Sequence, residues 1–381
     1  MLFWLAVLVL AAVALSFVGL LVGARRLPQV AEIEPVSDAA APSVSIVVAA
    51  RNEARGIEAG LRSLLALDYP ALEIVVVDDR STDATPEILA RMAESEPRIV
   101  PVRVDQLPER WLGKNHALWV GSTRAKGDWL LFVDADVVLA PDVLRRAMGR
   151  ALSAGRDHIT ITPTLELPGP LLQGFAVFFS ASFLLFTQPW KAPDPKARQF
   201  IGVGAFNLVR REAYVRAGTH ERIALRPDDD LKLGKILKQS GAGQELVQGL
   251  GAVRVEWYHS LGELVRGLEK NAFAGLDYNL GLAIAGAGSQ LFLNFVPFVA
   301  IAFGSGPTRA VGLATVLASV LGFGLVAREV GVAASRALLY PLVVLLFAFI
   351  VLRTATLNLA QGGIRWRDTF YPLSLLKTNK V

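Results

Sequence analysis

A short apolar run that ends in two aspartates is the feature that most constrains how this chain can fold. Leu130 to Val133 are apolar, and Asp134 and Asp136 follow directly. Four consecutive apolar residues predict a strand buried on both faces, as in a parallel sheet. Side chains two apart on an extended chain point the same way, so both carboxylates can face one site. The alternative is that the aspartates only end the strand and cap the next helix.

Strand and helix patterns alternate from residue 43 to residue 136 and predict a doubly wound α/β sheet. The strands are expected at 43–49, 72–79, 99–104 and 129–134. Helices are expected through 57–65, through 88–92 after N-cap candidates at 81–83, and in the segment from about 111 to about 125. The second strand also ends in acids, Asp78 and Asp79. Ligands of such sheets bind beyond the carboxyl ends of the strands. Converging carboxylates there fit Mg²⁺ or Mn²⁺ shared with phosphate oxygens.

Two segments of the second half add candidates to this crevice. Asp228, Asp229 and Asp230 open a predicted helix that Gly241 closes. Acids suit a helix N-terminus, so capping explains one or two of them, and the third is a candidate general base. Glycines between residues 202 and 204 let the backbone approach a ligand closely, unless they only form a turn.

Apolar stretches at both ends of the chain predict membrane insertion. Hydrophobic residues make up 53% of the 381 residues, and the mean hydropathy is +0.43. Residues 1–24 are long enough to span a bilayer of ~30 Å, and a cleaved signal peptide is the alternative. Arg25 and Arg26 predict that the following domain is cytoplasmic. The expected domains are the anchor at 1–24, a linker at 25–42, a globular domain at 43–277, membrane helices at 278–360 and a basic tail at 361–381.

The number of spans is left open by the sequence. Plausible spans are 281–303, 310–327 and 338–357, and all three together with the anchor would put the basic tail outside, against the positive-inside tendency. Two or three of them are therefore expected to cross. The apolar segment 170–190 is expected to be core, with a helix lying against the membrane as the alternative.

Composition excludes several classes of function. The chain has no cysteine, which removes disulfides, thiolate metal sites and a cysteine nucleophile. The net charge of +5 is not arranged as a basic stripe with aromatics, so no nucleic acid partner is expected.

Five segments in order resemble a membrane-anchored family 2 glycosyltransferase with the GT-A fold. They are Ala50-Arg-Asn-Glu53 after the first strand, VVVDDRSTD at 75–83, WLGKNHAL at 111–118, DAD at 134–136 and DDDLKLGKILKQSG at 228–241. The resemblance implies a mixed, mainly parallel sheet with helices on both faces, plus transmembrane helices. It implies that Glu53 and Asp79 contact the base and ribose of a nucleotide sugar and that Lys114 lies near the nucleotide. Asp136, helped by Asp134, would hold the metal.

The same resemblance assigns the remaining roles. Asp229 and Asp230 would form the acidic pair, with Asp230 as the base that deprotonates the acceptor hydroxyl. Gly204 is a candidate for acceptor binding, and Lys270 for the cation that steadies the leaving diphosphate; an exposed lysine is the alternative for Lys270.

The expected activity is inverting transfer from a nucleotide-diphosphate sugar, with UDP-hexose preferred, to a lipid at the cell membrane. The QxxRW signature of processive members is missing from the region around residues 266–273. Its absence favours single transfers to ceramide-, carotenoid- or hopanoid-like lipids over a polysaccharide synthase or a polyprenyl-phosphate glycosyltransferase. A catalytically inactive membrane scaffold is a further alternative.

Overall fold

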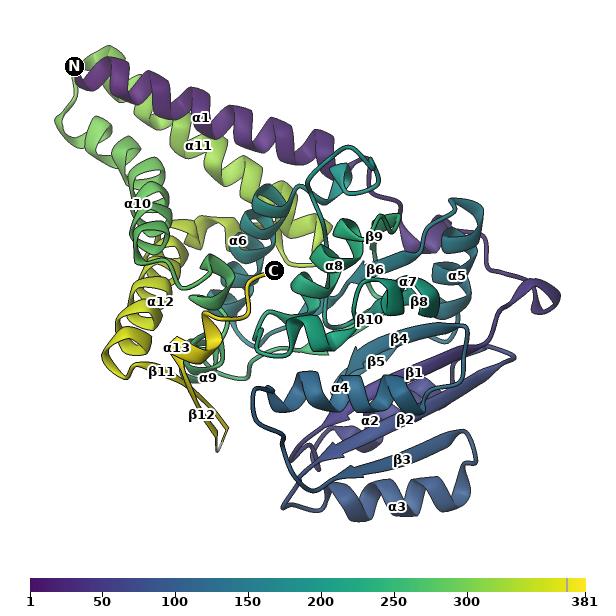
Figure 1. Ribbon diagram of the computed structural model, residues 1–381. Helices are drawn as coiled ribbons and strands as arrows, with labels where there is room; N and C mark the ends of the chain where they lie inside the picture. Colours follow the sequence, from purple (N-terminus) through teal and green to yellow (C-terminus); the bar gives the residue numbers. More distant parts are fainter. Residues whose placement is uncertain (368) are drawn as a thin grey trace. The chain divides into compact units, whose positions relative to one another are not determined.

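The protein, seen here in a computed structural model that describes residues 1–367 and 369–381, divides into two compact units (Figure 1). The sheet unit comprises Leu27–Leu165, Pro189–Glu256 and Thr378–Val381. The helical unit comprises Met1–Arg26, Glu166–Gln188 and Trp257–Lys377.

A seven-stranded mixed sheet of order β3-β2-β1-β4-β8-β6-β9 forms the centre of the sheet unit. β1 pairs in parallel with β2 and β4, and β2 with β3, whereas β8 is antiparallel to β4 and β6. Because β1, β2 and β4 are parallel, they deliver Ala50, Asp79 and Asp134 to one edge of the sheet. The strands are β1 Val44–Ala50, β2 Leu72–Asp79, β3 Ile99–Val104, β4 Trp129–Asp134, β6 His158–Thr162, β8 Asn207–Arg210 and β9 Gln244–Gln248.

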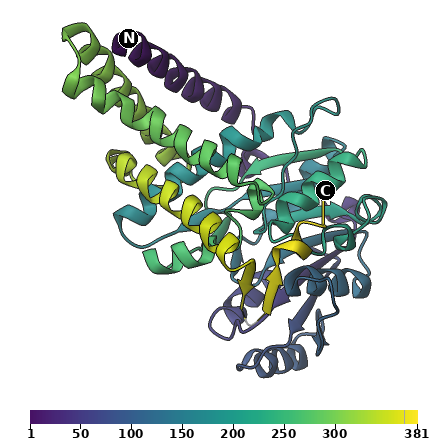
Figure 2. The same ribbon diagram turned by 60° about the vertical axis from the view of Figure 1, so that its left-hand side comes forward.

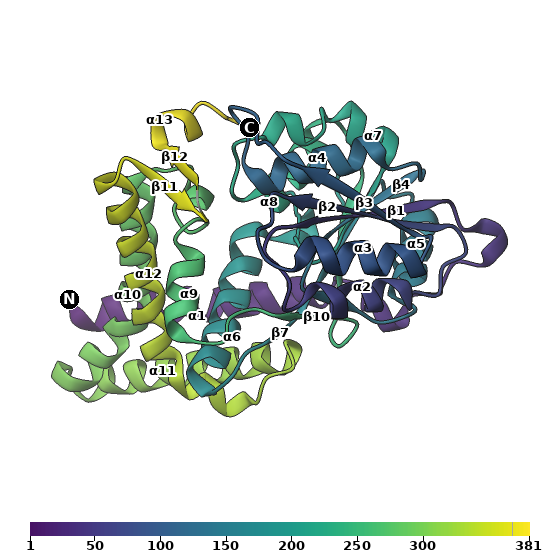
Figure 3. The same ribbon diagram turned by 90° about the horizontal axis from the view of Figure 1, so that it is seen from below.

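Helices cover both faces of this sheet (Figure 3). α2 (Ile57–Leu65), α3 (Thr85–Ser95) and α5 (Val143–Ser153) pack on one face, and α4 (Gly113–Arg124), α7 (Arg211–Arg216) and α8 (Asp229–Gln239) on the other. Ile46 and Val48 of β1 face the first group and Val47 the second, which is the alternation expected of a strand buried on both sides. The predicted fold class is confirmed.

Shorter elements complete the sheet unit. A smaller sheet has the order β5-β10-β7, with β5 at Val137–Leu139, β10 at Val253–Glu256 and β7 at Thr164–Glu166. The 3-10 helices are η1 Val30–Glu32, η2 Asp38–Ala40, η3 Pro189–Lys191 and η4 His220–Ile223.

Most of the segment expected to be a linker, 25–42, belongs to the sheet unit and packs within it. Val30 and Val36 are 4% and 8% exposed and belong to the same core as α5. Arg145 Nη1 donates to the Val36 carbonyl at 3.0 Å, and the Gln248 amide donates to the Pro28 carbonyl at 2.8 Å. The apolar side chains of this segment therefore bind it to the domain that follows.

The helical unit contains five helices, among the described residues, that are long and apolar enough to cross a membrane. They are α1 Leu2–Ala24, α6 Pro170–Thr187, α10 Leu280–Phe303, α11 Gly306–Glu329 and α12 Tyr340–Ala360, the last preceded by η6 Ala334–Leu339. α1 runs beside α11 and also contacts α10 (Figures 1 and 2). The unit also includes α9 Leu261–Leu268, η5 Ala274–Leu276, the hairpin of β11 Gly363–Trp366 and β12 Thr369–Pro372, and α13 Leu373–Leu376.

Chain connectivity shows that α6 does not cross a bilayer. β6 precedes α6 in the sequence and β8 follows it, yet the two strands pair in one sheet. A single crossing would separate them by the membrane. The expected globular domain, 43–277, contained this helix; in the structure Glu166–Gln188 and the segment from Trp257 group with the helical unit.

The last residues of the chain belong to the sheet unit. Asn379 accepts a hydrogen bond from the Leu225 amide and donates one to the Arg222 carbonyl, each at 2.9 Å. Thr378–Val381 would therefore lie on the same side of a membrane as the rest of the sheet unit. We expect an even number of α10, α11 and α12 to cross, which would agree with the positive-inside tendency.

Candidate active site

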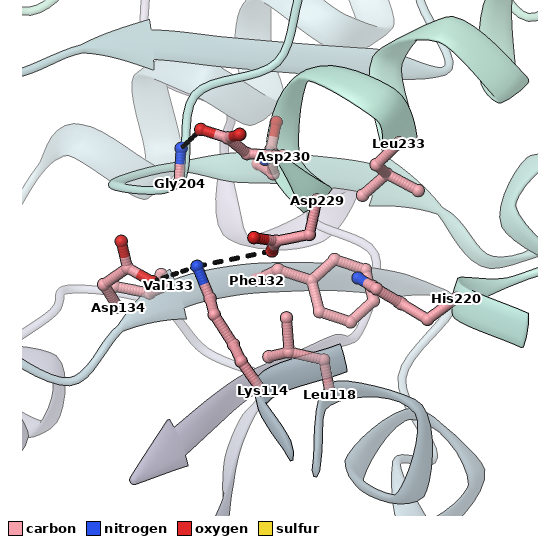
Figure 4. Close-up of a pocket in the computed structure, with 11 residues that line it drawn as sticks. Lys114, Leu118, Phe132, Val133, Asp134, Gly204, His220, Asp229, Asp230 and Leu233 are labelled. Carbon is pink, nitrogen blue, oxygen red and sulfur yellow. Dashed lines mark hydrogen bonds and ion pairs between the residues drawn. The ribbon is translucent and has the colours of Figure 1, made fainter. Parts of the chain in front are cut away.

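Lys114 and three aspartates meet in one pocket at the carboxyl edge of the sheet (Figure 4). Lys114 is the second residue of α4, and Asp134 is the last residue of β4. The Lys114 ammonium lies 2.7 Å from Asp134 Oδ1 and 3.3 Å from Asp229 Oδ2. Four predicted site residues, together with Gly204, are thus brought together from segments far apart in the sequence. The full lining is Lys114, Leu118, Phe132, Val133, Asp134, Gly204, Asn207, His220, Asp229, Asp230 and Leu233.

The acids that open α8 differ in what they contact. Asp228 forms a buried bidentate ion pair with Arg226 at 2.8 and 2.9 Å, and its side chain makes no capping hydrogen bond. Asp229 contacts Lys114, as described above. Asp230 Oδ2 accepts a hydrogen bond from the Gly204 amide at 2.8 Å. Only Asp229 and Asp230 therefore face the pocket, as the acidic pair was expected to do.

Glycines allow α8 to touch the loop that precedes β8. A Cβ on Gly202 would lie 1.9 Å from the Asp230 carbonyl oxygen, and one on Gly234 would lie 1.9 Å from that of Ile201. The glycines at 202 and 204 were expected to let the backbone approach a ligand; in the structure the close approach at Gly202 is to α8. Gly204 is a candidate for acceptor binding, but its amide donates a hydrogen bond to Asp230.

A buried glutamine, which the sequence analysis did not single out, holds the same loop and helix together. Gln244, the first residue of β9, accepts from the Ile201 amide at 2.9 Å and donates to the Gly234 carbonyl at 2.8 Å. Asn207 Oδ1 accepts a hydrogen bond from His158 Nε2 at 3.0 Å. No local pattern marks either residue, because their partners are distant in the sequence.

Burial and like charges shift the protonation equilibria of the site. Burial raises the pKa of Asp229 and of Asp230, while Lys114 opposes the rise in both. Burial acts to lower the pKa of Lys114, but Asp134, Asp229 and Asp230 outweigh it and raise that pKa above its usual value. Burial, with a smaller contribution from Lys114, lowers the pKa of His220 to about 3, so its ring is neutral.

Asp136 is an exposed residue two positions beyond Asp134 and is not among the residues that line the pocket. Loss of solvation, then repulsion from Asp134 and Glu53, raises the pKa of the Asp136 carboxyl to about 6. Such a cluster suits a hard divalent cation, whose charge would relieve the repulsion. Among the described residues no three His, Cys, Asp or Glu side chains are grouped to hold a metal. A metal here would thus be held by two carboxylates and need further oxygens from a ligand, which is the usual mode for Mg²⁺ at diphosphates.

At the same carboxyl edge of the sheet, two arginines surround the end of β2. Asp79 is buried and pairs with Arg80 at 2.7 and 2.9 Å, with Arg51 at 3.8 Å. Arg80 has a φ of 57°, in the left-handed region that non-glycine residues rarely adopt. The Glu53 amide donates to Thr85 Oγ1 at 2.9 Å. Asp79 thus ends β2, and Glu53 lies in the loop that follows the adjacent parallel strand β1.

Lys270 belongs to the helical unit, where its ammonium lies 4.5 Å from the centroid of the Trp366 ring. A lysine over an aromatic face is stabilised by the cation–π interaction. Its expected role at the diphosphate remains a prediction.

Comparison with known proteins identifies the domain. The family model described as glycosyl transferase family 2 matches residues 45–214. Two 4,4'-diaponeurosporenoate glycosyltransferases of Staphylococcus aureus are 28% and 25% identical over 180 and 217 residues, which are 47% and 57% of this chain. The chain spans about half the length of these curated relatives, 47% and 56%.

A solved structure shows the same fold. A mannosyltransferase from Pyrobaculum calidifontis, in complex with GDP-Man and Mn²⁺, has a TM-score of 0.59 at 23% identity, covering 94% of this chain and 98% of that one. The family match therefore identifies residues 45–214 as a family 2 glycosyltransferase domain, and the strand order together with this likeness shows that its fold is GT-A.

Proposed function

We propose that this protein is an inverting glycosyltransferase that moves a sugar from a nucleotide-diphosphate sugar to a hydroxyl of a membrane lipid. The observation that carries the proposal is the pocket in which Lys114 and Asp134 meet the acidic pair, Asp229 and Asp230. Lys114, beside the carboxylate of Asp134 at the end of β4, could bind a diphosphate together with its metal. Asp229 and Asp230, in the same pocket, could accept the proton of an acceptor hydroxyl.

On the donor side, Asp79 and Glu53 are proposed to contact the base and ribose, with UDP-hexose as the expected donor. Asp136 and Asp134 would hold Mg²⁺ or Mn²⁺, which would neutralise charge on the diphosphate as the sugar leaves. Lys114 would bind diphosphate oxygens directly. The mannosyltransferase complex with Mn²⁺ supports a divalent cation in this fold.

On the acceptor side, Asp230 is proposed to take the proton of the attacking hydroxyl. The acceptor oxygen then forms its bond to the anomeric carbon from the face opposite the leaving group. The bond from that carbon to the diphosphate oxygen breaks, and the nucleoside diphosphate leaves with the electron pair. The configuration therefore inverts, and an α-linked donor gives a β-glycoside. Gly204 would act through Asp230, because its amide orients the carboxylate.

A lipid acceptor is supported by the membrane helices and by the relatives, which are named for 4,4'-diaponeurosporenoate, a carotenoid acid. The catalytic domain is proposed to face the cytoplasm, because Arg25 and Arg26 follow α1. A polyprenyl-phosphate acceptor or a polymer product is the alternative. An inactive scaffold is disfavoured because the acidic pair and both aspartates of DAD are present.

The test is sugar transfer by the full-length protein in membranes, with labelled UDP- and GDP-sugars and lipid extracts as acceptors. We expect one discrete glycolipid, identified by mass spectrometry, and a β-linkage by NMR from an α-linked donor. Chelation of divalent cations and the variant Asp136→Asn should each abolish transfer, and the variant should remain folded. A polymer, an α-linkage, or full activity in excess chelator would contradict the corresponding part of the proposal.

A further inference from the structure

Lys114 lies among the three aspartates that line the pocket. It is the one cationic side chain among the described residues that line the pocket, and His220 there is neutral. Its ammonium bridges Asp134, a proposed metal ligand, and Asp229 of the acidic pair (Figure 4). The side chain therefore acts as the counter-ion of two carboxylates that would otherwise repel each other.

A divalent cation and this ammonium compete for the same carboxylate. With Asp134 Oδ1 only 2.7 Å from Lys114, a metal on Asp134 would lie within a few ångströms of another positive charge. Repulsion at such a distance is strong in a partly buried site. A diphosphate removes the conflict, because its oxygens can bind the metal and the ammonium at once.

The backbone that carries Lys114 is fixed, so the exchange requires movement of the side chain only. The neighbouring Asn115 is fully buried and donates to the Ile223 carbonyl at 2.8 Å and to the Arg226 carbonyl at 3.0 Å. On the other side, a Cβ on Gly113 would lie 2.4 Å from Asp79 Oδ2. The first turn of α4 is thus held at both flanks, whereas the lysine has a long, rotatable stem.

We propose that Lys114 keeps the divalent cation out of the site until the nucleotide diphosphate arrives, so that metal and donor bind together. Without the nucleotide, the ammonium holds Asp134 and Asp229. With it, the ammonium moves to the diphosphate, the Asp134 oxygen that Lys114 contacted becomes accessible to the metal, and Asp229 loses its ion pair with Lys114. The inference rests on the proposed function only for the presence of a metal and a diphosphate in this pocket.

The test is Mn²⁺ binding to the full-length protein in lipid nanodiscs, followed by electron paramagnetic resonance without nucleotide and with UDP or GDP. For the wild type we expect weak binding alone and at least tenfold tighter binding with the matching nucleotide. Lys114→Gln should bind Mn²⁺ alone at least tenfold more tightly than the wild type, and nucleotide should add little. Lys114→Arg keeps the charge and should resemble the wild type. Lys126→Gln, at an exposed position after α4, is the matched control.

Thermal unfolding of each variant shows whether it is folded. Mn²⁺ affinity that is the same in the wild type and in Lys114→Gln would overturn the inference, as would tight Mn²⁺ binding by the wild type without nucleotide. Absence of Mn²⁺ binding in every form would overturn both the inference and the proposed metal. The expected binding pattern without sugar transfer from any donor would leave the inference standing and contradict the proposed function.

Discussion

Replacement of Gly234 by alanine tests whether backbone contact between α8 and the loop before β8 positions the proposed base. In the interior of a helix, Gly→Ala normally stabilises a protein by ~1 kcal/mol. At this position a Cβ would lie 1.9 Å from the Ile201 carbonyl oxygen. Overpacking of this kind costs ~1–3 kcal/mol. Because the clash involves backbone and cannot be relieved by a rotamer change, we expect Gly234→Ala to destabilise the protein.

The clash at Gly234 is expected to displace Asp230 as well. An ordinary contact for a Cβ begins at 3.4 Å, so loop and helix must separate by roughly 1.5 Å. The hydrogen bond of 2.8 Å from the Gly204 amide to Asp230 joins the same loop to the same helix, and that separation would break it. Misplacement of a catalytic group by ~1 Å can cost ~10²-fold in rate. We therefore expect kcat to fall about 10²-fold, with little change in KM for the donor.

The assay combines thermal unfolding with steady-state sugar transfer by the same preparations. Gln239→Ala is the matched control, because Gln239 lies on the same helix and is exposed. Surface substitutions of that kind usually change stability by less than ~0.5 kcal/mol. A Gly234→Ala protein that is more stable than the wild type and retains full kcat would refute the reasoning.

Four further predictions concern the acids and the C-terminus. Asp230→Asn should lower kcat by ~10²–10⁴-fold and leave donor binding and stability nearly unchanged. Asp228→Asn should instead destabilise the protein by ~3–5 kcal/mol in thermal or denaturant unfolding, because it breaks a buried pair with Arg226; equal effects of the two would contradict the assignment. Since burial raises the pKa of Asp230, and the base must be ionised, kcat/KM should fall with decreasing pH at a midpoint well above the ~3.9 of an ordinary aspartate; a midpoint near 4 would argue against it. A reporter fused after Val381 should lie on the same side of the membrane as one inserted at Gly155, a turn with open space around it; opposite sides would contradict the even number of crossings.

Much of the fold could be predicted from local hydrophobic patterning. The strand expected at residues 99–104 is β3, Ile99–Val104, and the strand that ends in the DAD motif is β4. Strands buried on both faces produce continuous apolar runs, and polar acids at their ends stand out against such runs. Since parallel strands bring their carboxyl ends together, Asp79 and Asp134 could be assigned to one edge from the sequence.

Contacts between distant segments could not be predicted in this way. The bridge from Lys114 to Asp229 joins residues on two different helices, and Gln244 acts on a loop more than 40 positions before it. The pairing of Asp228 with Arg226 was also missed, because three acids at a helix start look equivalent when only the capping pattern is considered. The segment 170–190 would be apolar whether it packs in the core or lies against a membrane, so its sequence does not distinguish the two. The pairing of β6 with β8 shows that it does not cross a bilayer.

The raised pKa values of Asp136, Asp229 and Asp230 imply that these carboxylates lower the free energy of unfolding at neutral pH. The pKa of Asp136 is raised to about 6, above its value in an unfolded chain, so the folded state binds more protons between those two values. Stability therefore falls as the pH rises through this range and does not recover at neutral pH. Asp229 and Asp230 add to the effect in the same direction. A metal–diphosphate complex that neutralised these carboxylates and bound only the folded state would restore the stability by mass action. The charges that lower the stability would thus favour binding of the proposed donor together with a metal.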